Sequence, residues 1–207
     1  MIKKTNILIL DHGYDVGKKL KEIPEYELTN SEGYSCLDEI VHQGFPSVPS
    51  CLILGETSSE DQSQLEVVAA VKQLRWRIPI LVLVKEWDLK SIGAIYRAGA
   101  CDVLEYPLKL GDFVGAVRRV IHVANLNFEL ASAVMDAKNR LQRLKSKERE
   151  IVRMVSSGFL NKEIAEKLDL ALVTVKVYRA TAMKKLGAGN PAEMVKVAVL
   201  GGLNLNI

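Results

Sequence analysis

The sequence predicts an α/β domain with a five-stranded parallel sheet, followed by a linker helix and an all-α domain of four helices. Three observations lead to this prediction. Strand-like and helix-like segments alternate over the first 125 of the 207 residues, the central strand-like segments are continuous apolar runs of the kind buried on both faces of a sheet, and the remainder contains no strand pattern. A chain of this length also suits two domains.

The expected strands of the first domain are short runs that end at glycine, proline or charged residues. They are Asn6–Leu10, a weak edge strand at Tyr26–Thr29, Ser50–Leu54, Pro79–Val84 and Asp102–Glu105. The segments between and after them predict helices at Val16–Ile23, Ser35–Gln43, Ser63–Leu74, Leu89–Ala98 and Gly111–Val123. In a parallel sheet, ligands bind where the strands end, so the residues that follow the strands form the candidate site.

The second half of the chain is expected to be helical throughout. Asn125–Leu144 contains neither Gly nor Pro, and its apolar residues recur at steps of three and four, which predicts a linker helix, alone or continuous with the helix before it. Further helices are expected at Lys147–Ser157, Asn161–Leu168, Leu172–Leu186 and from the favourable start Asn190-Pro191 to Leu200. We therefore expect a domain at 1–124, a helical linker at 125–143 and a second domain at 144–207.

The composition argues against several classes of protein. Apolar residues make up 48% of the chain and charged residues 26%, which is typical of a folded globular protein. No apolar run reaches the roughly 18 residues of a membrane span, and three widely spaced cysteines indicate neither a disulfide framework nor a metal site. We expect a reduced cytoplasmic protein with no membrane contact, metal or cofactor and, since no pair of nucleophile and base stands out, with no enzymatic activity.

Basic residues are concentrated in the second half of the chain. Residues 1–125 hold 14 basic and 17 acidic side chains, whereas residues 126–207 hold 14 basic and 8 acidic ones. This sign suits a polyanionic partner, although a solvated basic helix surface would have it too. Two short helices with a basic second one indicate a helix-turn-helix, in which Lys and Arg suit guanine edges and phosphates and Val suits a thymine methyl group.

Four segments of the second half resemble the LuxR-type DNA-binding domain. They are Leu144-Lys-Ser-Lys-Glu-Arg-Glu-Ile-Val, Gly158-Phe-Leu-Asn-Lys-Glu-Ile-Ala-Glu-Lys-Leu, Thr174-Val-Lys-Val-Tyr-Arg and Met183-Lys-Lys-Leu-Gly-Ala. The first 125 residues resemble the receiver domain of NarL/FixJ-type response regulators, which implies a flavodoxin-like fold. The ending Asn190-Pro-Ala-Glu-Met-Val-Lys-Val-Ala resembles the family's fourth helix, which commonly forms the dimer contact of the DNA-bound protein.

This resemblance implies that Leu172–Leu186 is the recognition helix. It implies base contacts by Lys176, Val177 and Arg179 and phosphate contacts by Thr174, Tyr178, Lys184 and Asn161. Val177 also lies near the apolar stripe of the helix, so a place in the core is the alternative for it. For Lys184 the alternative is a charge that complements the end of the helix dipole.

The first domain departs from the receiver pattern at the positions that carry its phosphoryl chemistry. The acidic pair that helps to hold Mg²⁺ is replaced by Asp11-His12, the acceptor Asp by Gly55 or Glu56 depending on the direction of counting, the hydroxyl residue by Val84, and the Lys by Tyr106. The missing groups are the nucleophile and the cations that offset charge on the phosphoryl oxygens. We therefore expect control without phosphorylation, with the filled cleft being either a small-molecule or partner pocket or a repacked core.

The DNA-binding half departs from its family pattern at two helix starts. The usual Ser or Thr is replaced by Leu160 before Asn161 and by Ala171 at the start of the recognition helix. Each lost cap is expected to cost about 0.5–2 kcal/mol of helix stability. Asn161 and Ser146 are candidate substitute caps for their helices.

Two hypotheses about function follow. The leading one is a homodimeric regulator of transcription that binds specific double-stranded DNA, with dimer surfaces on Leu89–Ala98, Gly111–Val123 and the last helix, and with RNA polymerase or another regulator as a candidate protein partner. The alternative is a protein-interaction module or co-regulator that docks another regulator and binds DNA weakly.

Overall fold

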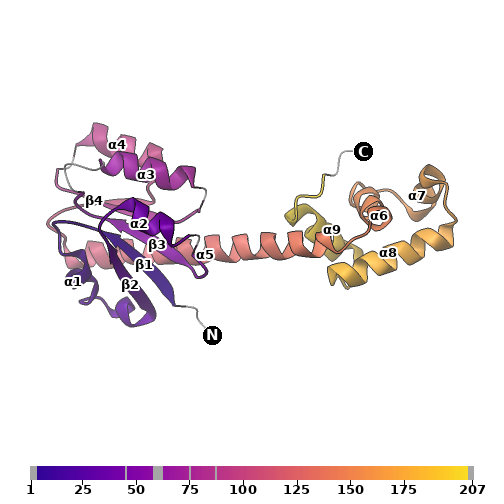
Figure 1. The fold of residues 1–207 in the computed structure, drawn as a ribbon, viewed down its shortest axis with the longest axis horizontal. Helices are drawn as coiled ribbons and strands as arrows, with labels where there is room; N and C mark the ends of the chain where they lie inside the picture. The colour runs from indigo at the N-terminus through magenta and orange to yellow at the C-terminus, as the bar shows by residue number, and fades with distance from the viewer. Residues whose placement is uncertain (1–3, 45, 58–62, 75, 87, 205–207) are drawn as a thin grey trace. The chain divides into compact units, whose positions relative to one another are not determined.

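The structure is a computed structural model that describes residues 4–44, 46–57, 63–74, 76–86 and 88–204. It divides into two compact units, Met1–Glu129 and Leu130–Ile207, each of which is described by itself (Figure 1). Among the helices of the described ranges, none combines the length and the apolar character that crossing a membrane would require.

The first unit contains a sheet of five parallel strands in the order β2-β1-β3-β4-β5. The strands are β1 (Thr5–Leu10), β2 (Thr29–Tyr34), β3 (Ser50–Leu54), β4 (Ile80–Val84) and β5 (Asp102–Glu105). The helices that follow the first four strands are α1 (Val16–Leu20), α2 (Leu37–His42), α3 (Gln64–Gln73) and α4 (Leu89–Ala98). This strand order is the flavodoxin-like one, so the predicted fold class is confirmed.

Helices cover both faces of this sheet, which explains why its central strands are apolar without alternation. Ile7 and Ile9 of β1 belong to a core with α1 and with α5 (Leu110–Gln142), where Phe113 is fully buried. Leu8 and Leu10 of the same strand belong to a second core with α2, α3 and α4. The helices α3 and α4 lie together on one side of the sheet in Figure 1.

The edge strand differs from the prediction. A 3₁₀ turn, η1 (Pro24–Leu28), occupies most of the segment predicted as a strand at Tyr26–Thr29, and β2 begins only at Thr29. Of the six residues in β2 only Thr29 is buried. Because an edge strand in this position buries so little, it lacks the apolar run that made the other strands recognisable, and that prediction was wrong.

A single helix of 33 residues, α5, contains nearly all of both segments predicted at Gly111–Val123 and Asn125–Leu144. Its continuity follows from the lack of Gly and Pro between 125 and 144, since either residue would have weakened or ended it. Its first part supplies Val117 and Val120 to the core of the first unit, and Leu141 near its end belongs to a core of the second unit. The domain limits at 124 and 144 remain predictions.

The second unit consists of α6 (Ser146–Ser156), α7 (Asn161–Leu168), α8 (Leu172–Leu186) and α9 (Pro191–Leu200), together with the end of α5. Asn190 caps α9, because its side-chain oxygen accepts the N–H of Glu193 at 2.9 Å. One core joins α6, α8 and α9 around Leu186 and Met194. The four-helix, all-α character predicted for this region is confirmed.

Candidate functional site

The helices α7 and α8 form a helix-turn-helix on a shared core. Ile164 of α7 and Val175 of α8 are fully buried and pack with Ile151 and Met154 of α6. The turn between the helices passes through Asp169, whose φ of 50° places it in the left-handed region. This core fixes one side of α8 and leaves the other side to solvent.

The solvent-facing side of α8 carries exposed residues at steps of three and four, and these therefore share one helix face. They are Val173, Lys176, Val177, Ala180 and Lys184. Val173 is 67% exposed and Val177 59% exposed. Val177 thus lies outside the core, and the predicted base contacts Lys176 and Val177 are neighbours on an open surface.

Three other predicted contacts on α8, Thr174, Tyr178 and Arg179, are half-buried. Tyr178 packs against the core formed by α6, α7 and α8. The Arg179 guanidinium donates a hydrogen bond of 2.8 Å to the side-chain oxygen of Asn161, the first residue of α7. The structure therefore joins to one another two residues that the sequence presents as separate DNA contacts.

Neither α7 nor α8 has a side-chain cap at its start, where Leu160 and Ala171 take the N-cap positions. The expectation that Asn161 caps α7 is wrong, because Asn161 is the first helical residue and its oxygen accepts from Arg179. Glu163 partly compensates, since its carboxylate accepts the N–H of Leu160 at 2.7 Å. The start of α7 therefore keeps one compensating hydrogen bond, from the Leu160 N–H to Glu163, whereas the N-cap side chain of α8 contributes none.

Ser146 is likewise inside α6 rather than its cap, and a buried ion pair fixes this helix start to the end of α8. Glu148 accepts the N–H of Lys145 at 2.8 Å and two hydrogen bonds from the Lys185 ammonium at 2.8 and 2.6 Å. Burial opposes ionisation of Glu148, but the hydrogen bonds and charges of Lys185 and Lys145 outweigh it and lower the pKa of the carboxyl. We did not predict this pair from the sequence, since its members are 37 residues apart.

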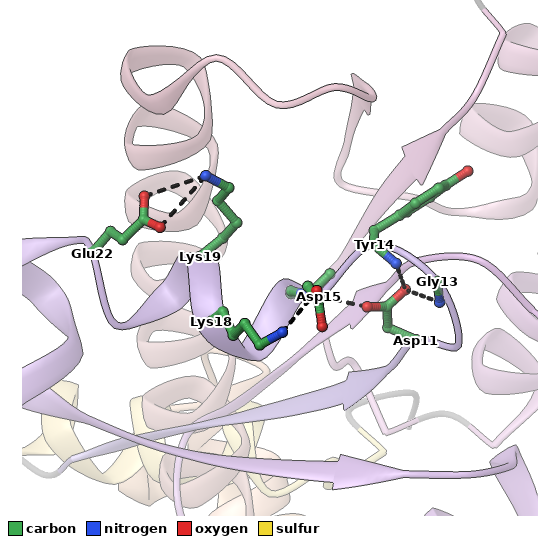
Figure 2. A network of polar contacts seen from close by, with 8 residues as sticks. Asp11, Gly13, Tyr14, Asp15, Lys18, Lys19 and Glu22 are labelled. Carbon is green, nitrogen blue, oxygen red and sulfur yellow. Dashed lines mark hydrogen bonds and ion pairs between the residues drawn. The ribbon is translucent and has the colours of Figure 1, made fainter.

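At the carboxyl edge of the sheet in the first unit, Asp11 organises the loop after β1. Its carboxylate accepts hydrogen bonds from the backbone N–H groups of Gly13, Tyr14, Val16 and Glu56, at 3.3, 3.0, 3.1 and 3.2 Å. Figure 2 shows this carboxylate pointing into the turn of the loop, beside the ion pair of Lys18 with Asp15. Asp11 therefore satisfies local backbone donors.

Gly55 directly follows β3 and lies against Asp11. A Cβ atom at Gly55 would collide with the Asp11 carboxylate, and one at Gly13 would collide with that of Glu56. Glu56 itself is partly exposed, and one of its oxygens lies 3.8 Å from the Lys85 ammonium. The two glycines thus leave room for two carboxylates.

Aromatic and apolar groups occupy the ends of β4 and β5. Val84 is buried, and the ring of Tyr106 stacks on that of Tyr14 with a centroid distance of 4.4 Å and an angle of 12°. Burial, then the charges of Glu56 and Asp11 and the neighbouring Tyr106, raise the pKa of Tyr14. Gln64, which the sequence analysis missed, donates from its amide to the carbonyls of Gly55 and Leu83, both at 2.6 Å.

A cavity of ≈ 620 Å³ lies beside the loop that follows β1, and residues of α1 and β2 line it as well. Asp11, His12, Lys18, Lys21 and Tyr34 are among the residues that line it. The His12 Nε2 atom lies 2.8 Å from the carbonyl oxygen of Ser35. Val84 and Tyr106 are not among the residues that line this cavity, and the stacking of Tyr106 on Tyr14 favours a repacked core over a pocket at those two positions.

Known proteins resemble both units. The family described as "Bacterial regulatory proteins, luxR family" matches residues 142–198. The transcriptional regulatory protein FixJ of Rhizobium meliloti is 30% identical over 158 residues, which cover 76% of this chain and 77% of that protein. The response regulator protein TodT of Pseudomonas putida strain F1 is 28% identical over 191 residues, covering 92% of this chain and 84% of TodT.

Two further relatives extend this result. The response regulator protein TmoT of Ectopseudomonas mendocina is 31% identical over 147 residues, and the match covers 71% of this chain but only 66% of TmoT. The structure of the response regulator StyR has the same fold, with a TM-score of 0.75, 23% identity and coverage of 95% of this chain and 98% of StyR.

These similarities define a class of protein: a receiver-like domain joined to a LuxR-type helix-turn-helix, as found in regulators of transcription. The chain belongs to the NarL/FixJ-type response regulators. It is by that membership a DNA-binding regulator of transcription, and the relatives named above are described as response regulators or transcriptional regulatory proteins.

Proposed function

We propose that the chain regulates transcription by binding a specific double-stranded DNA site as a homodimer, under a receiver-like domain that works without phosphorylation. The single observation that supports DNA readout best is the open face of α8, on which Lys176, Val177 and Lys184 are exposed while Val175 anchors the opposite face. A basic helix held in this way can enter the major groove and present side chains to base edges.

Within this proposal, Lys176 and Val177 contact bases, and Thr174, Tyr178 and Lys184 bind phosphates near them. Arg179 contacts a base while its guanidinium remains hydrogen-bonded to Asn161. Asn161 contributes a phosphate contact beside it. Phosphate contacts set the orientation of the protein, whereas base contacts carry the sequence information.

Dimerisation follows from the number of contacts. One helix-turn-helix neutralises few phosphates, and two copies roughly double that number across two half-sites. Leu89 of α4, 81% exposed, and Val199 of α9, 55% exposed, are apolar residues on the surfaces proposed for the dimer.

Control without phosphorylation is supported by the carboxyl edge of the sheet. Asp11 already accepts four backbone N–H groups, which leaves it poorly placed to bind a metal. Gly55 has no nucleophile, and Tyr106 stacks where a cation would be needed to offset phosphoryl charge. Glu56, with Lys85 at 3.8 Å, instead supplies a carboxylate at this edge.

The test is a selection of bound duplexes from a random DNA pool, followed by gel shifts of the enriched duplex and a scrambled competitor over a range of salt concentrations. We expect specific binding that weakens steeply with salt and falls about tenfold or more in Lys176→Ala, since a good base contact contributes about 1–3 kcal/mol. Lys138→Ala, which removes an exposed lysine of α5, is the matched control and should retain the preference.

Binding that is weak and blind to sequence would contradict this function and favour the interaction module that docks another regulator. The receiver is tested separately by incubation with Mg²⁺ and a small phosphodonor. An acid-labile adduct in the mass spectrum of the intact protein would contradict control without phosphorylation, while leaving DNA binding untouched.

A further inference from the structure

The recognition helix exposes two valines at its start. Val173 is 67% exposed and Val177 59% exposed, and their spacing of four residues stacks them on one face, one turn apart. Neither side chain belongs to the cores of the second unit, which contain Val175 and Ala182 from this helix. Two neighbouring isopropyl groups are thus presented to solvent where a recognition helix makes its base contacts.

The charges around the two valines decide which partner this apolar face fits. The sequence of α8 contains four basic residues and no acidic one, and the exposed Lys176 and Lys184 flank the valines on the same face. An apolar protein partner would have to bury these ammonium groups without compensation, which is costly. The major groove instead offers phosphates to the lysines and an apolar group to the valines.

We propose that Val173 and Val177 act together as a reader of thymine C5-methyl groups, which determines the sequence preference of the recognition helix. The proposal rests on the DNA-binding function proposed above and names the chemistry that it recognises. Thymine is the one standard base with a methyl group on its major-groove edge, and apolar side chains contact that group. Neither valine can donate or accept a hydrogen bond, so its contribution comes from the methyl contact alone.

The helix geometry also limits where the thymines lie. Side chains four residues apart on a helix have Cβ atoms about 5–6 Å apart, which is close to two steps of about 3.4 Å along a DNA strand. The two methyl groups are therefore expected within about two base-pair steps of each other in each half-site. Val173, beyond the contacts that the family resemblance implies, becomes a specificity-determining residue.

The experiment removes the methyl groups without altering the hydrogen-bonding pattern of the bases. In the duplex most enriched by selection from a random pool, each thymine is replaced in turn by uracil, and affinities are measured for the wild-type chain, Val173→Ala and Val177→Ala. We expect uracil at the contacted positions to weaken wild-type binding about three- to fivefold for each methyl group, in line with burial of one methylene-sized group.

Each valine variant should bind the thymine duplex about threefold more weakly and should lose no further affinity when its own thymine becomes uracil, because the contact is already gone. Met135→Ala, which truncates a 59% exposed residue of α5, is the control and should respond to uracil as the wild type does. Circular dichroism should show folded variants, since all three positions are exposed.

The outcomes separate this proposal from the function beneath it. Specific binding that is indifferent to uracil overturns the methyl reader while DNA recognition stands. A loss in Val173→Ala that is equal on both duplexes, with uracil sensitivity coupled to Val177 alone, overturns the assignment of Val173. Failure to select any preferred duplex overturns both.

Discussion

The carboxyl edge of the sheet and the recognition helix use their polar side chains in opposite ways. Asp11 is occupied by four backbone N–H groups, and Tyr106 is stacked on Tyr14, so the edge satisfies its own groups. On α8, Lys176 and Lys184 point away from the core and are exposed. Asp11 and Tyr106 at the sheet edge are thus engaged within the domain, whereas the two lysines of α8 are available to a partner.

The largest expected effect comes from a buried ion pair of the second unit, that of Glu148 and Lys185. Lys185→Met should destabilise the second unit by about 3–5 kcal/mol, because it leaves a buried carboxylate without its charge partner. Urea unfolding monitored by circular dichroism measures this loss. Lys184→Met removes the exposed neighbour and should change stability by less than about 0.5 kcal/mol; equal losses in the two variants would show that the pair is not special.

Substitution of Gly55, at the carboxyl edge of the sheet, is expected to have the next largest effect on stability. Gly55→Ala should cost about 1–3 kcal/mol, because its Cβ displaces a carboxylate that is held by four hydrogen bonds. Gly55→Asp should be destabilised at least as much and should form no adduct with a phosphodonor. Gly17→Ala in α1, where a Cβ meets open space, is the matched control and should be neutral or slightly stabilising in thermal unfolding.

The contact between Asn161 and Arg179 tests how far the recognition surface depends on internal support. Asn161→Ala should weaken specific DNA binding about fivefold to tenfold, since a hydrogen bond to a charged group contributes about 1.5–3 kcal/mol and part of it is replaced by water. A double-mutant cycle with Arg179→Ala should give a coupling energy of about 1 kcal/mol in DNA binding. Additive losses would mean that the two residues meet DNA independently.

The smallest effect is a pH dependence that belongs to the second unit. The pKa of Glu148 is lower in the folded state than its ordinary value of 4.5, so its contribution to stability is complete above that value. The contribution should be lost as pH falls through the lowered folded pKa. Urea midpoints between about pH 6 and 3 should therefore fall less steeply in Glu148→Gln than in the wild type.

The sequence was sufficient for the central strands and the helices of the second unit, because continuous apolar runs and helix-ending glycines reflect burial and backbone conformation directly. It was not sufficient for β2, where Thr29 alone is buried and hydrophobic patterning has little to act on. The start of α7 was predicted correctly at Asn161, but its cap was not, because the Asn161 side-chain oxygen accepts a tertiary hydrogen bond from Arg179 instead of a local N–H.

The site residues were predicted individually, whereas the contacts between them were not predicted. Asn161 and Arg179 are 18 residues apart, and Asp11 and Glu56 are 45 apart, so their hydrogen bonds depend on the path of the chain in three dimensions. Gln64 gave no signal because an amide at the start of a helix is unremarkable until two strand ends lie within its reach. The roles of these residues in DNA contact and regulation remain predictions for the experiments above.

The close approach of Gly55 to Asp11 limits which substitutions this part of the chain can accept during evolution. A side chain introduced at position 55 by one codon change would meet the space that the Asp11 carboxylate occupies. A second change, at the neighbouring loop, would have to come first or together with it. The two positions are therefore coupled, and a side chain larger than glycine at position 55 is expected only together with a change at position 11.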